Sequence, residues 1–138
     1  MNDGRSFLDT NVLVYTDDQD SPEKKRRALE LFATLRRRRS GVVSTQVLQE
    51  YFVTATRKLH VGPEVARRKI EIFGRLDLVT LGLEDVLGAI DLLRLHQLSF
   101  WDALVVRAAL VYECSRLLSE DFQAGRRFER LEVVNPFA

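Results

Sequence analysis

The stretch Ser6-Phe7-Leu8-Asp9-Thr10-Asn11 places a short apolar run directly before an acidic and an amide side chain. Such a run predicts a buried β-strand that ends at Asp9. Asn11 is then placed to cap a short helix through Tyr15, because Asn side chains accept hydrogen bonds from the first backbone N–H groups of a helix. If Asn11 supplies this cap, Asp9 is left for another role at the end of the strand.

Short apolar runs alternate with helix-length segments along the rest of the chain. Further strands are predicted at Val42-Val43, Leu76 to Leu81, Arg116 to Leu118 and Val133-Val134. A first long helix is predicted to start at Ser21-Pro22 and to be ended by Gly41. Four more helices are predicted: one capped by Ser44 or Thr45, one that starts at Gly62-Pro63, one along Val86 to Leu93, and one that Ser99 opens and that runs through Tyr112. This alternation implies right-handed crossovers and a mostly parallel sheet covered on both faces, which is an α/β fold.

Length and composition limit the class of protein. The chain has 138 residues, 46% of them hydrophobic and 30% charged. This length predicts one domain over residues 1–138, and this apolar content excludes an intrinsically disordered chain. There are 21 Lys and Arg against 20 Asp and Glu, and a net charge of +1 argues against a simple polycationic nucleic-acid binder.

The N-terminus and the single cysteine bear on the compartment. Met1 to Arg5 leads into no long apolar region, so we expect no secretory signal, and no stretch is apolar for long enough to cross a membrane. Cys114 is the only cysteine, which excludes an internal disulfide and a metal–thiolate cluster. We therefore expect a cytoplasmic protein with Cys114 packed as a small hydrophobic residue.

Four acidic residues stand at the ends of the predicted strands or near the start of the next helix. They are Asp9, Glu50, Asp102 and Asp121. Each has a plain structural explanation when taken alone. Asp9 can cap a helix, and Glu50 can be a partly exposed side chain that reaches a nearby Lys or Arg. Asp102 can form a capping box with Ser99, and Asp121 can be a loop or cap aspartate. In an α/β sheet, however, these positions converge on one edge, where ligands bind.

Carboxylates held together repel each other and raise each other's pKa unless a cation neutralises them. All-oxygen ligands suit hard cations, so Mg²⁺ or Mn²⁺ is expected at this edge rather than zinc.

Four ordered motifs carry a family resemblance. They are Phe7 to Asn11, Ser44 to Glu50, Ser99 to Leu104 and Leu117 to Phe122, and the ending Asn135-Pro136-Phe137 adds to the resemblance. Together they resemble the successive motifs of PIN-domain ribonucleases, most closely the VapC-type toxins of bacterial toxin–antitoxin pairs. The resemblance covers nearly the whole chain and implies a single PIN-like domain, an α/β/α sandwich around a mostly parallel sheet.

The resemblance also implies a site and an activity. Asp9, Asp102, Asp121 and Glu50 match the acids that bind one or two metal ions, with Glu50 often acting through water. Asn11 and Ser119 match polar positions that orient these carboxylates. Glu120 is either an extra acid of the site or a solvated neighbour, and we expect the second. The implied activity is endonucleolytic cleavage of single-stranded or looped RNA. The implied partners are a cognate antitoxin, which inserts an Arg into the acidic pocket, and a second copy of the chain.

Basic residues around the acids are candidates to bind RNA phosphates, although at least half of them are expected to be solvated helix faces. The candidates are Lys24 to Arg27, Arg36 to Arg39, Arg57-Lys58, Arg67 to Lys69 and Arg126-Arg127. We expect Trp101 to pack between helices rather than stack a base, and His96 to be structural. If the four acids form a cation-neutralised cluster, 21 basic residues stand against 16 remaining acidic ones, a balance of +5.

Rival functions fit the residues less well. A haloacid-dehalogenase-like phosphatase needs a second Asp where Asn11 stands, and a response-regulator receiver needs an acidic pair that Thr10 does not supply. A noncatalytic module that only binds RNA or protein remains the alternative. EDTA-sensitive RNA cleavage separates that alternative from the nuclease.

Overall fold

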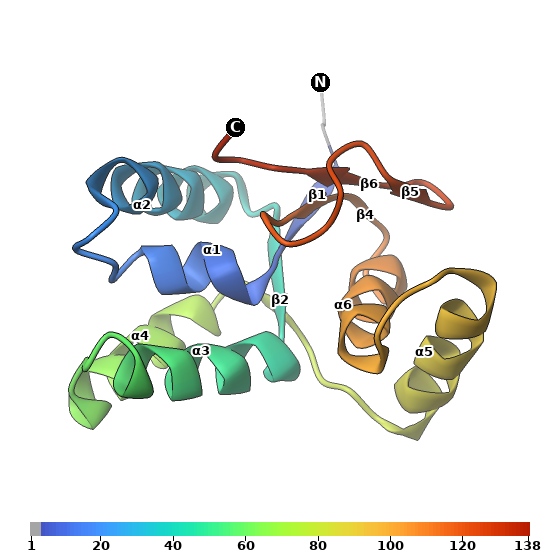
Figure 1. Cartoon of the computed structure of the whole chain (residues 1–138), viewed down its shortest axis with the longest axis horizontal. Coiled ribbons are helices and arrows are strands. Elements are labelled where there is room, and N and C mark those ends of the chain that lie inside the picture. Colours follow the sequence, from blue (N-terminus) through green and yellow to red (C-terminus); the bar gives the residue numbers. More distant parts are fainter. Residues whose placement is uncertain (1–3) are drawn as a thin grey trace.

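The computed structural model describes residues 4–138 as a six-stranded sheet flanked by helices (Figure 1). Its strands are β1 (Arg5–Leu8), β2 (Gly41–Ser44), β3 (Asp77–Val79), β4 (Cys114–Leu118), β5 (Arg127–Phe128) and β6 (Leu131–Val134). Their order in the sheet is β3-β2-β1-β4-β6-β5, and only β5 runs antiparallel. Residues 1–3, which begin the predicted domain and the segment expected to lack a secretory signal, lie outside the described residues.

Two groups of helices cover the sheet. They are α1 (Thr10–Tyr15), α2 (Pro22–Arg38), α3 (Thr45–Arg57) and α4 (Pro63–Phe73) in one group, and α5 (Leu83–Leu95) and α6 (Phe100–Val111) in the other. Figure 1 shows the two groups on opposite sides of the strands. The predicted α/β architecture, mostly parallel and flanked by helices, is therefore confirmed.

The strand order reverses between β1 and β4. From β1 the chain builds outward through β2 to β3, and it then returns to place β4 on the other side of β1. Ligands of open α/β sheets bind beyond the carboxyl ends of the strands at such a reversal. Asp9 follows β1 directly and Ser119 follows β4 directly, so the topology brings these two segments to the reversal.

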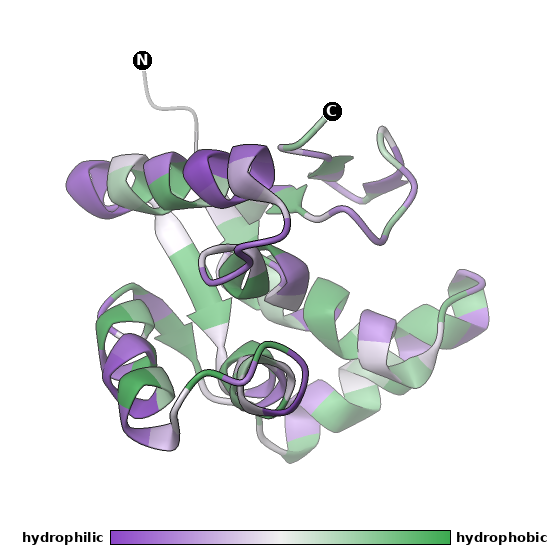
Figure 2. Ribbon diagram, turned by 60° about the vertical axis from the view of Figure 1, so that its left-hand side comes forward, coloured by the Kyte–Doolittle hydropathy of each residue, from purple (hydrophilic) through white to green (hydrophobic). Residues whose placement is uncertain are grey.

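The core lies between the sheet and the helices. Phe7, Val42, Val43 and Leu117 of the central strands are fully buried, and Cys114 is buried with them as predicted. Burial raises the pKa of the Cys114 thiol to about 12, so this thiol is unreactive near neutral pH. Figure 2 colours the central strands hydrophobic and the helices with alternating polar and apolar residues. Within residues 4–138, no helix is both long and apolar enough to cross a membrane.

Two predicted helix ends differ from the structure. Asp9, not Asn11, is the N-cap of α1, because its carboxylate accepts a hydrogen bond from the backbone N–H of Thr10. Gly41 does not end α2: that helix stops at Arg38 with Arg39 in the left-handed region, and Gly41 begins β2. Ser44 and Ser99 do cap α3 and α6 through their hydroxyl groups.

Strand lengths and one helix face also differ. The third strand is three residues long rather than the predicted Leu76 to Leu81, and the two-residue β5 was not predicted. A strand of two residues has no alternation long enough to recognise in a sequence. On α5 the buried residues are Ala89 and Leu92, whereas Val86, Leu87 and Ile90 of the predicted apolar face are exposed.

Candidate active site

Asp9 is the most buried of the four candidate acids, at 6% exposed. Its position is fixed from three directions. One carboxylate oxygen accepts from the Thr10 backbone N–H at 2.8 Å. The other accepts from the Ser119 hydroxyl at 2.7 Å and from the Asn11 side-chain amide at 3.3 Å. A charged group held in this way has a fixed orientation, which suits a ligand or catalytic group better than a freely rotating side chain.

Asn11 joins the loop after β1 to the loop after β4. Its Nδ2 also donates to Oδ2 of Asp121 at 3.2 Å, and its Oδ1 accepts from the Glu120 backbone N–H at 3.1 Å. The Ser119 hydroxyl accepts from the Asp121 backbone N–H at 3.1 Å. Asn11 and Ser119, both predicted to orient the acids, therefore contact Asp9 and the Asp121 segment together.

Glu50 faces the same region from α3. Its carboxylate accepts from the Thr10 hydroxyl at 2.6 Å and from the Gln46 side-chain amide at 3.2 Å. Both donors are neutral, so the two contacts leave the charge of Glu50 uncompensated. These partners differ from the Lys or Arg expected for an ordinary surface Glu.

Asp102 lies in the first turn of α6, where its backbone N–H donates to the Ser99 hydroxyl at 3.0 Å. A single amide links this turn to α3, because Gln46 Nε2 donates to the Trp101 carbonyl at 3.1 Å as well as to Glu50. The hydrogen bonds from Gln46 therefore tie the segment of Asp102 to the segment of Glu50.

The four carboxylates lie close enough to raise the pKa values of two of them. Burial raises the pKa of Asp9 to about 6, and repulsion from Asp121 and Glu50 adds to this, although the hydrogen bonds from Ser119 and Thr10 oppose it. Burial also raises the pKa of Asp102, again with repulsion from Asp121 and Glu50. The structure thus brings all four predicted acids into one electrostatic cluster.

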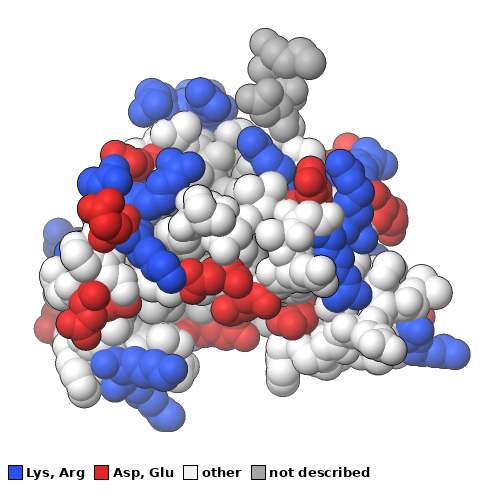
Figure 3. All heavy atoms as spheres, turned by 45° about the horizontal axis from the view of Figure 1, so that its top comes forward, with Lys and Arg blue, Asp and Glu red and all other residues white. Residues whose placement is uncertain are grey.

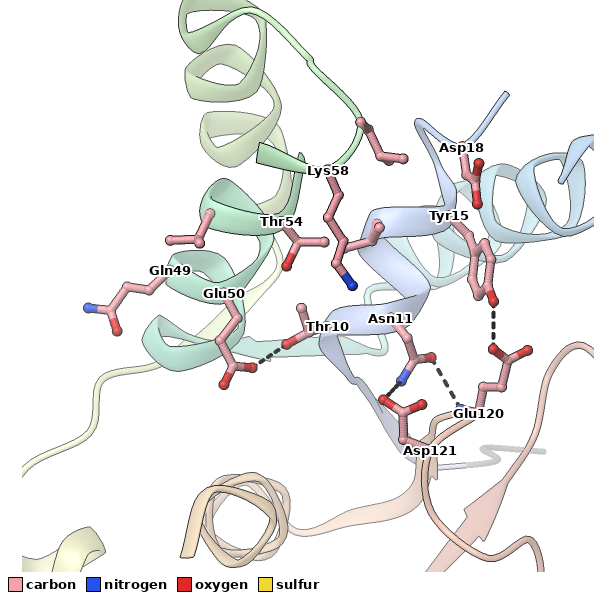
Figure 4. A pocket seen from close by; sticks show the side chains of 13 residues that line it. Thr10, Asn11, Tyr15, Asp18, Gln49, Glu50, Thr54, Lys58, Glu120 and Asp121 are labelled. Carbon is pink, nitrogen blue, oxygen red and sulfur yellow. Dashed lines mark hydrogen bonds between the residues drawn. The ribbon is translucent and has the colours of Figure 1, made fainter. Parts of the chain in front are cut away.

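A groove of about 730 Å³ opens beside this cluster (Figure 4). Its acidic lining residues are Asp18, Glu50, Glu120 and Asp121, and Lys58 is the one cation among the described side chains that line it. Its apolar lining consists of Val14 from α1, Val53 from α3 and Leu59 from the segment that follows α3. The groove therefore combines an acidic end with an apolar wall.

Glu120 is not the solvated neighbour that was predicted. Its carboxylate accepts from the Tyr15 hydroxyl at 2.6 Å and from the Lys24 ammonium, and Lys24 also donates to the Tyr15 oxygen at 3.2 Å. Although partial burial opposes it, the hydrogen bonds from Lys24 and Tyr15 leave the pKa of Glu120 lowered. Because Glu120 precedes Asp121 directly, this cluster anchors the loop that carries Asp121.

The basic candidates divide between the two edges of the sheet. Figure 3 shows acidic side chains gathered near the middle of one face, with Lys and Arg on either side. Two lysines lie beside the acids. Lys24 donates a hydrogen bond to Glu120, and Lys58 lines the groove together with Glu50 and Asp121. Arg36 and Arg39 line a separate cavity of about 280 Å³ with Arg75, Gly41 and Asp77. This cavity lies at the amino ends of β2 and β3, so the Arg36 to Arg39 run stands at the edge opposite the acids.

Several other basic candidates have structural partners. Lys69 pairs with Asp17 at 2.9 Å, Arg67 lies 3.7 Å from Glu71, and Arg127 lies 3.4 Å from Glu132. Other contacts are Arg26 with Glu23 and Glu30, Arg27 with the Pro136 carbonyl, and Arg126 over the Phe128 ring.

The two aromatic predictions have different outcomes. Trp101 is 61% exposed, so the expectation that it packs between helices is wrong. Its ring meets Phe100 edge-on, with the centroids 5.2 Å apart. His96 packs edge-on against Phe128 at 5.0 Å, which agrees with a structural role.

Three contributors to the site were not predicted: Thr10, Gln46 and Tyr15. Lys24 was expected to bind phosphate, not to pair with Glu120. Helical spacing contains part of the missing signal. Gln46 precedes Glu50 by four residues and Tyr15 follows Asn11 by four, so each pair lies on one helix face. The tertiary contacts of Thr10 with Glu50 and of Lys24 with Glu120 have no such local signature.

The donor chemistry of the site fits a hard divalent cation. Its acids offer only oxygen atoms, which Mg²⁺ and Mn²⁺ prefer. In addition, Gln46 donates to Glu50 through Nε2, and its buried Oε1 has no hydrogen-bond partner in the structure. As placed in residues 4–138, no group of three or more His, Cys, Asp and Glu side chains is arranged to hold an ion. Ion binding therefore requires adjustment of the carboxylate side chains.

The sequence model of the family described as PIN domain matches residues 6–132. The match spans most of the chain and all six strands from Ser6 to Glu132 in whole or in part. The chain therefore belongs to the PIN domain family. No curated protein matches the sequence.

Solved structures with a similar fold include toxins of toxin–antitoxin systems. VapC20 of Mycobacterium tuberculosis, described as a sarcin-ricin loop cleaving toxin, has a TM-score of 0.65 at 18% identity, covering 84% of this chain and 91% of its own. A toxin–antitoxin complex from Klebsiella pneumoniae has a TM-score of 0.68 at 18% identity, and the match covers 95% of this chain and 97% of the other. VapBC2 from Rickettsia felis, bound to a promoter DNA fragment, has a TM-score of 0.61 at 20% identity, covering 93% and 96%. The chain is thus a PIN domain with the fold of VapC toxins.

Proposed function

We propose that this PIN domain is a metal-dependent endoribonuclease and the toxin of a type II toxin–antitoxin pair. The observation that carries the proposal is the cluster of Asp9, Glu50, Asp102 and Asp121 at the reversal of the sheet, with the pKa of Asp9 raised to about 6. A structural role alone gives no reason to gather four carboxylates that repel one another. Binding of a divalent cation would offset that repulsion.

In this proposal Asp9, Asp102 and Asp121 bind Mg²⁺ directly, Mn²⁺ can replace it, and Glu50 contributes directly or through water. The bound ion would lower the pKa of a water molecule and stabilise charge on the phosphate. Asn11 and Ser119 hold Asp9 and Asp121 at a fixed separation through their hydrogen bonds. Thr10 orients Glu50 by donating a hydrogen bond from its hydroxyl group to the Glu50 carboxylate.

The groove beside the acids is the proposed path of the RNA. Its lining of both polar and apolar side chains suits a single strand or loop, in which bases are accessible for apolar contact. Lys58 is positioned to contact a backbone phosphate, because it is exposed and lines the groove together with Glu50 and Asp121. Figure 4 shows its ammonium group extending toward the acidic end.

The test is cleavage of an RNA with defined loops by the purified protein. We expect internal cuts in loops with Mg²⁺ or Mn²⁺, none in EDTA, and recovery when Mg²⁺ is restored. An Asp102→Asn variant controls for a contaminating nuclease, because the substitution changes one oxygen and leaves the Ser99 cap on the backbone N–H. Binding of RNA without cleavage under any of these conditions would instead support the noncatalytic module.

An antitoxin partner is also part of the proposal, since two of the structures with this fold contain the antitoxin. The groove suits a peptide with apolar side chains against Val14, Val53 and Leu59 and an Arg beside Glu50 and Asp121. Such a peptide would inhibit cleavage by occupying the RNA path. We expect this interaction, like the cleavage, to take place in the cytoplasm.

We further propose a homodimer formed through α5. Five of the ten large apolar side chains exposed among the described residues belong to this helix, namely Leu83, Val86, Leu87, Ile90 and Leu95. Exposed apolar groups in such number mark association surfaces. A Leu87→Glu variant should shift the mass measured by light scattering from dimer to monomer. A Leu29→Glu variant, altered on α2, should leave the mass unchanged.

A further inference from the structure

Gln46 occupies an unusual position for an amide side chain. It is 6% exposed, yet it is the second residue of α3 and lies between two segments of the candidate site. Its Nε2 donates to Oε2 of Glu50 at 3.2 Å and to the carbonyl of Trp101 at 3.1 Å. The two N–H bonds of one amide thus connect α3 with the turn that carries Asp102.

The orientation of this amide follows from its partners. Both a carboxylate oxygen and a backbone carbonyl are acceptors, so only the NH₂ group of Gln46 can face them. The flipped amide would bring its oxygen against two other oxygens. Oε1 is therefore directed elsewhere, although it shares a carbon atom with Nε2 and must remain close to Glu50 and the first turn of α6.

Oε1 of Gln46 is buried and has no hydrogen-bond partner in the structure. A buried acceptor without a donor is destabilising, so native proteins rarely retain one without a reason. Near Glu50 the Thr10 hydroxyl already donates to that carboxylate, and near Asp102 the Ser99 hydroxyl caps α6, while the acids themselves are acceptors when ionised. Water bound to a cation of the site is a strong donor, and it would satisfy Oε1 without displacing these contacts.

We infer that Gln46 is a positioning residue of the metal site, with its NH₂ group setting Glu50 relative to Asp102 and its Oε1 accepting from metal-bound water. The inference rests on the proposed function. Groups that orient ligands in this way change metal affinity or activity by about 10–100-fold when they are removed. A residue that only packed α3 against α6 would affect stability in the absence of metal and leave the affinity for metal unchanged.

The test compares Mn²⁺ binding by the wild-type protein and a Gln46→Met variant, measured by calorimetry. Met has a similar length and no amide, so it retains volume while removing both hydrogen bonds and the acceptor. We expect the dissociation constant for Mn²⁺ to rise about tenfold. The Mg²⁺ concentration that gives half-maximal RNA cleavage should rise in parallel, with KM for RNA unchanged at saturating Mg²⁺.

Two further variants make the result decisive. Gln46→Asn retains an amide that is one methylene too short to join Glu50 and Trp101, so it should weaken Mn²⁺ binding like Gln46→Met if both are folded by circular dichroism. Gln97→Met removes an exposed amide in the loop between α5 and α6 and should bind Mn²⁺ like the wild type. Wild-type affinity in either folded Gln46 variant would overturn the inference, even with reduced thermal stability. Mn²⁺ binding without RNA cleavage in the wild type would overturn the proposed nuclease alone, and absence of Mn²⁺ binding would overturn both.

Discussion

The two edges of the sheet differ in how they hold charge. At the carboxyl edge, Asp9 is almost fully buried and accepts three hydrogen bonds from Thr10, Asn11 and Ser119. At the amino edge, Arg36, Arg39 and Arg75 surround a smaller cavity and are all exposed. Exposed arginines keep their water, whereas buried carboxylates are stable only with designed partners. Burial and fixed hydrogen bonds, rather than the density of charge, therefore distinguish the candidate site.

Loss of a proposed metal ligand should have the largest effect. We expect Asp9→Ala or Asp102→Ala to lower the rate of RNA cleavage by at least about a hundredfold, because ion-based stabilisation of charge contributes several kcal/mol. Single-turnover cleavage with saturating Mg²⁺ measures this. Retention of the wild-type rate in either folded variant would remove the acids from the mechanism.

The stability of the metal-free protein should depend on pH through Asp9. Its pKa is about 6 in the folded protein against an ordinary value of 3.8, so the folded state holds a proton that the unfolded state has lost between these values. Stability therefore falls as pH rises from about 4 to about 6. In EDTA at pH 8, Asp9→Asn should be more stable than the wild type by on the order of 1–3 kcal/mol, with the difference lost near pH 4. Urea unfolding at the two pH values measures it, and an equal difference at both would contradict the assignment.

The contrast between the edges should also appear in RNA binding. Lys58→Ala should raise KM for RNA about threefold to tenfold and reduce the salt dependence of binding by about 0.7 in the log–log slope, as expected for one lost phosphate contact on a single strand. The triple variant Arg36→Ala, Arg39→Ala, Arg75→Ala removes three charges from the opposite edge. A larger loss of affinity in the triple variant than in Lys58→Ala would mean that RNA binds at the amino edge of the sheet rather than beside the acids.

The anchor of the Asp121 loop should give a smaller effect. Tyr15→Phe removes the hydrogen bond to Glu120, which contributes about 1 kcal/mol, and should lower kcat by a few-fold. Tyr112→Phe is the matched control, because its hydroxyl donates to the Leu78 carbonyl outside the site. Both variants should lose similar thermal stability. A reduced kcat in both would mean that general destabilisation, rather than the position of Asp121, explains the loss.

The sequence predicted the fold and the place of the acids because both depend on local patterns. Apolar runs followed by Asp9 and Asp121 indicate strand ends, and parallel strands bring such ends together. The capping role of Asp9 and the contacts of Glu120 were missed for a physical reason. Asp9 caps α1 while joining the cluster, so one residue serves two functions that were treated as alternatives. Glu120 finds Tyr15 and Lys24 only through tertiary contacts about a hundred residues apart in sequence.

Surface contacts were the least predictable. Trp101 and the α5 side chains have apolar patterns typical of a core, yet they are exposed in the single chain. The four consecutive arginines of Arg36 to Arg39 looked like a binding run because of their charge alone. Their distance from the acids follows from the position of α2 before β2, which places the end of the helix at the amino edge.

The acids at the carboxyl edge are proposed to bind a divalent cation. The most direct measurement is anomalous diffraction from crystals of the protein soaked in Mn²⁺. We expect an anomalous peak beside Asp9, Asp102 and Asp121, and no peak there in an Asp9→Asn crystal treated in the same way. Wild-type crystals with no peak at these residues, under conditions in which the protein cleaves RNA, would contradict it.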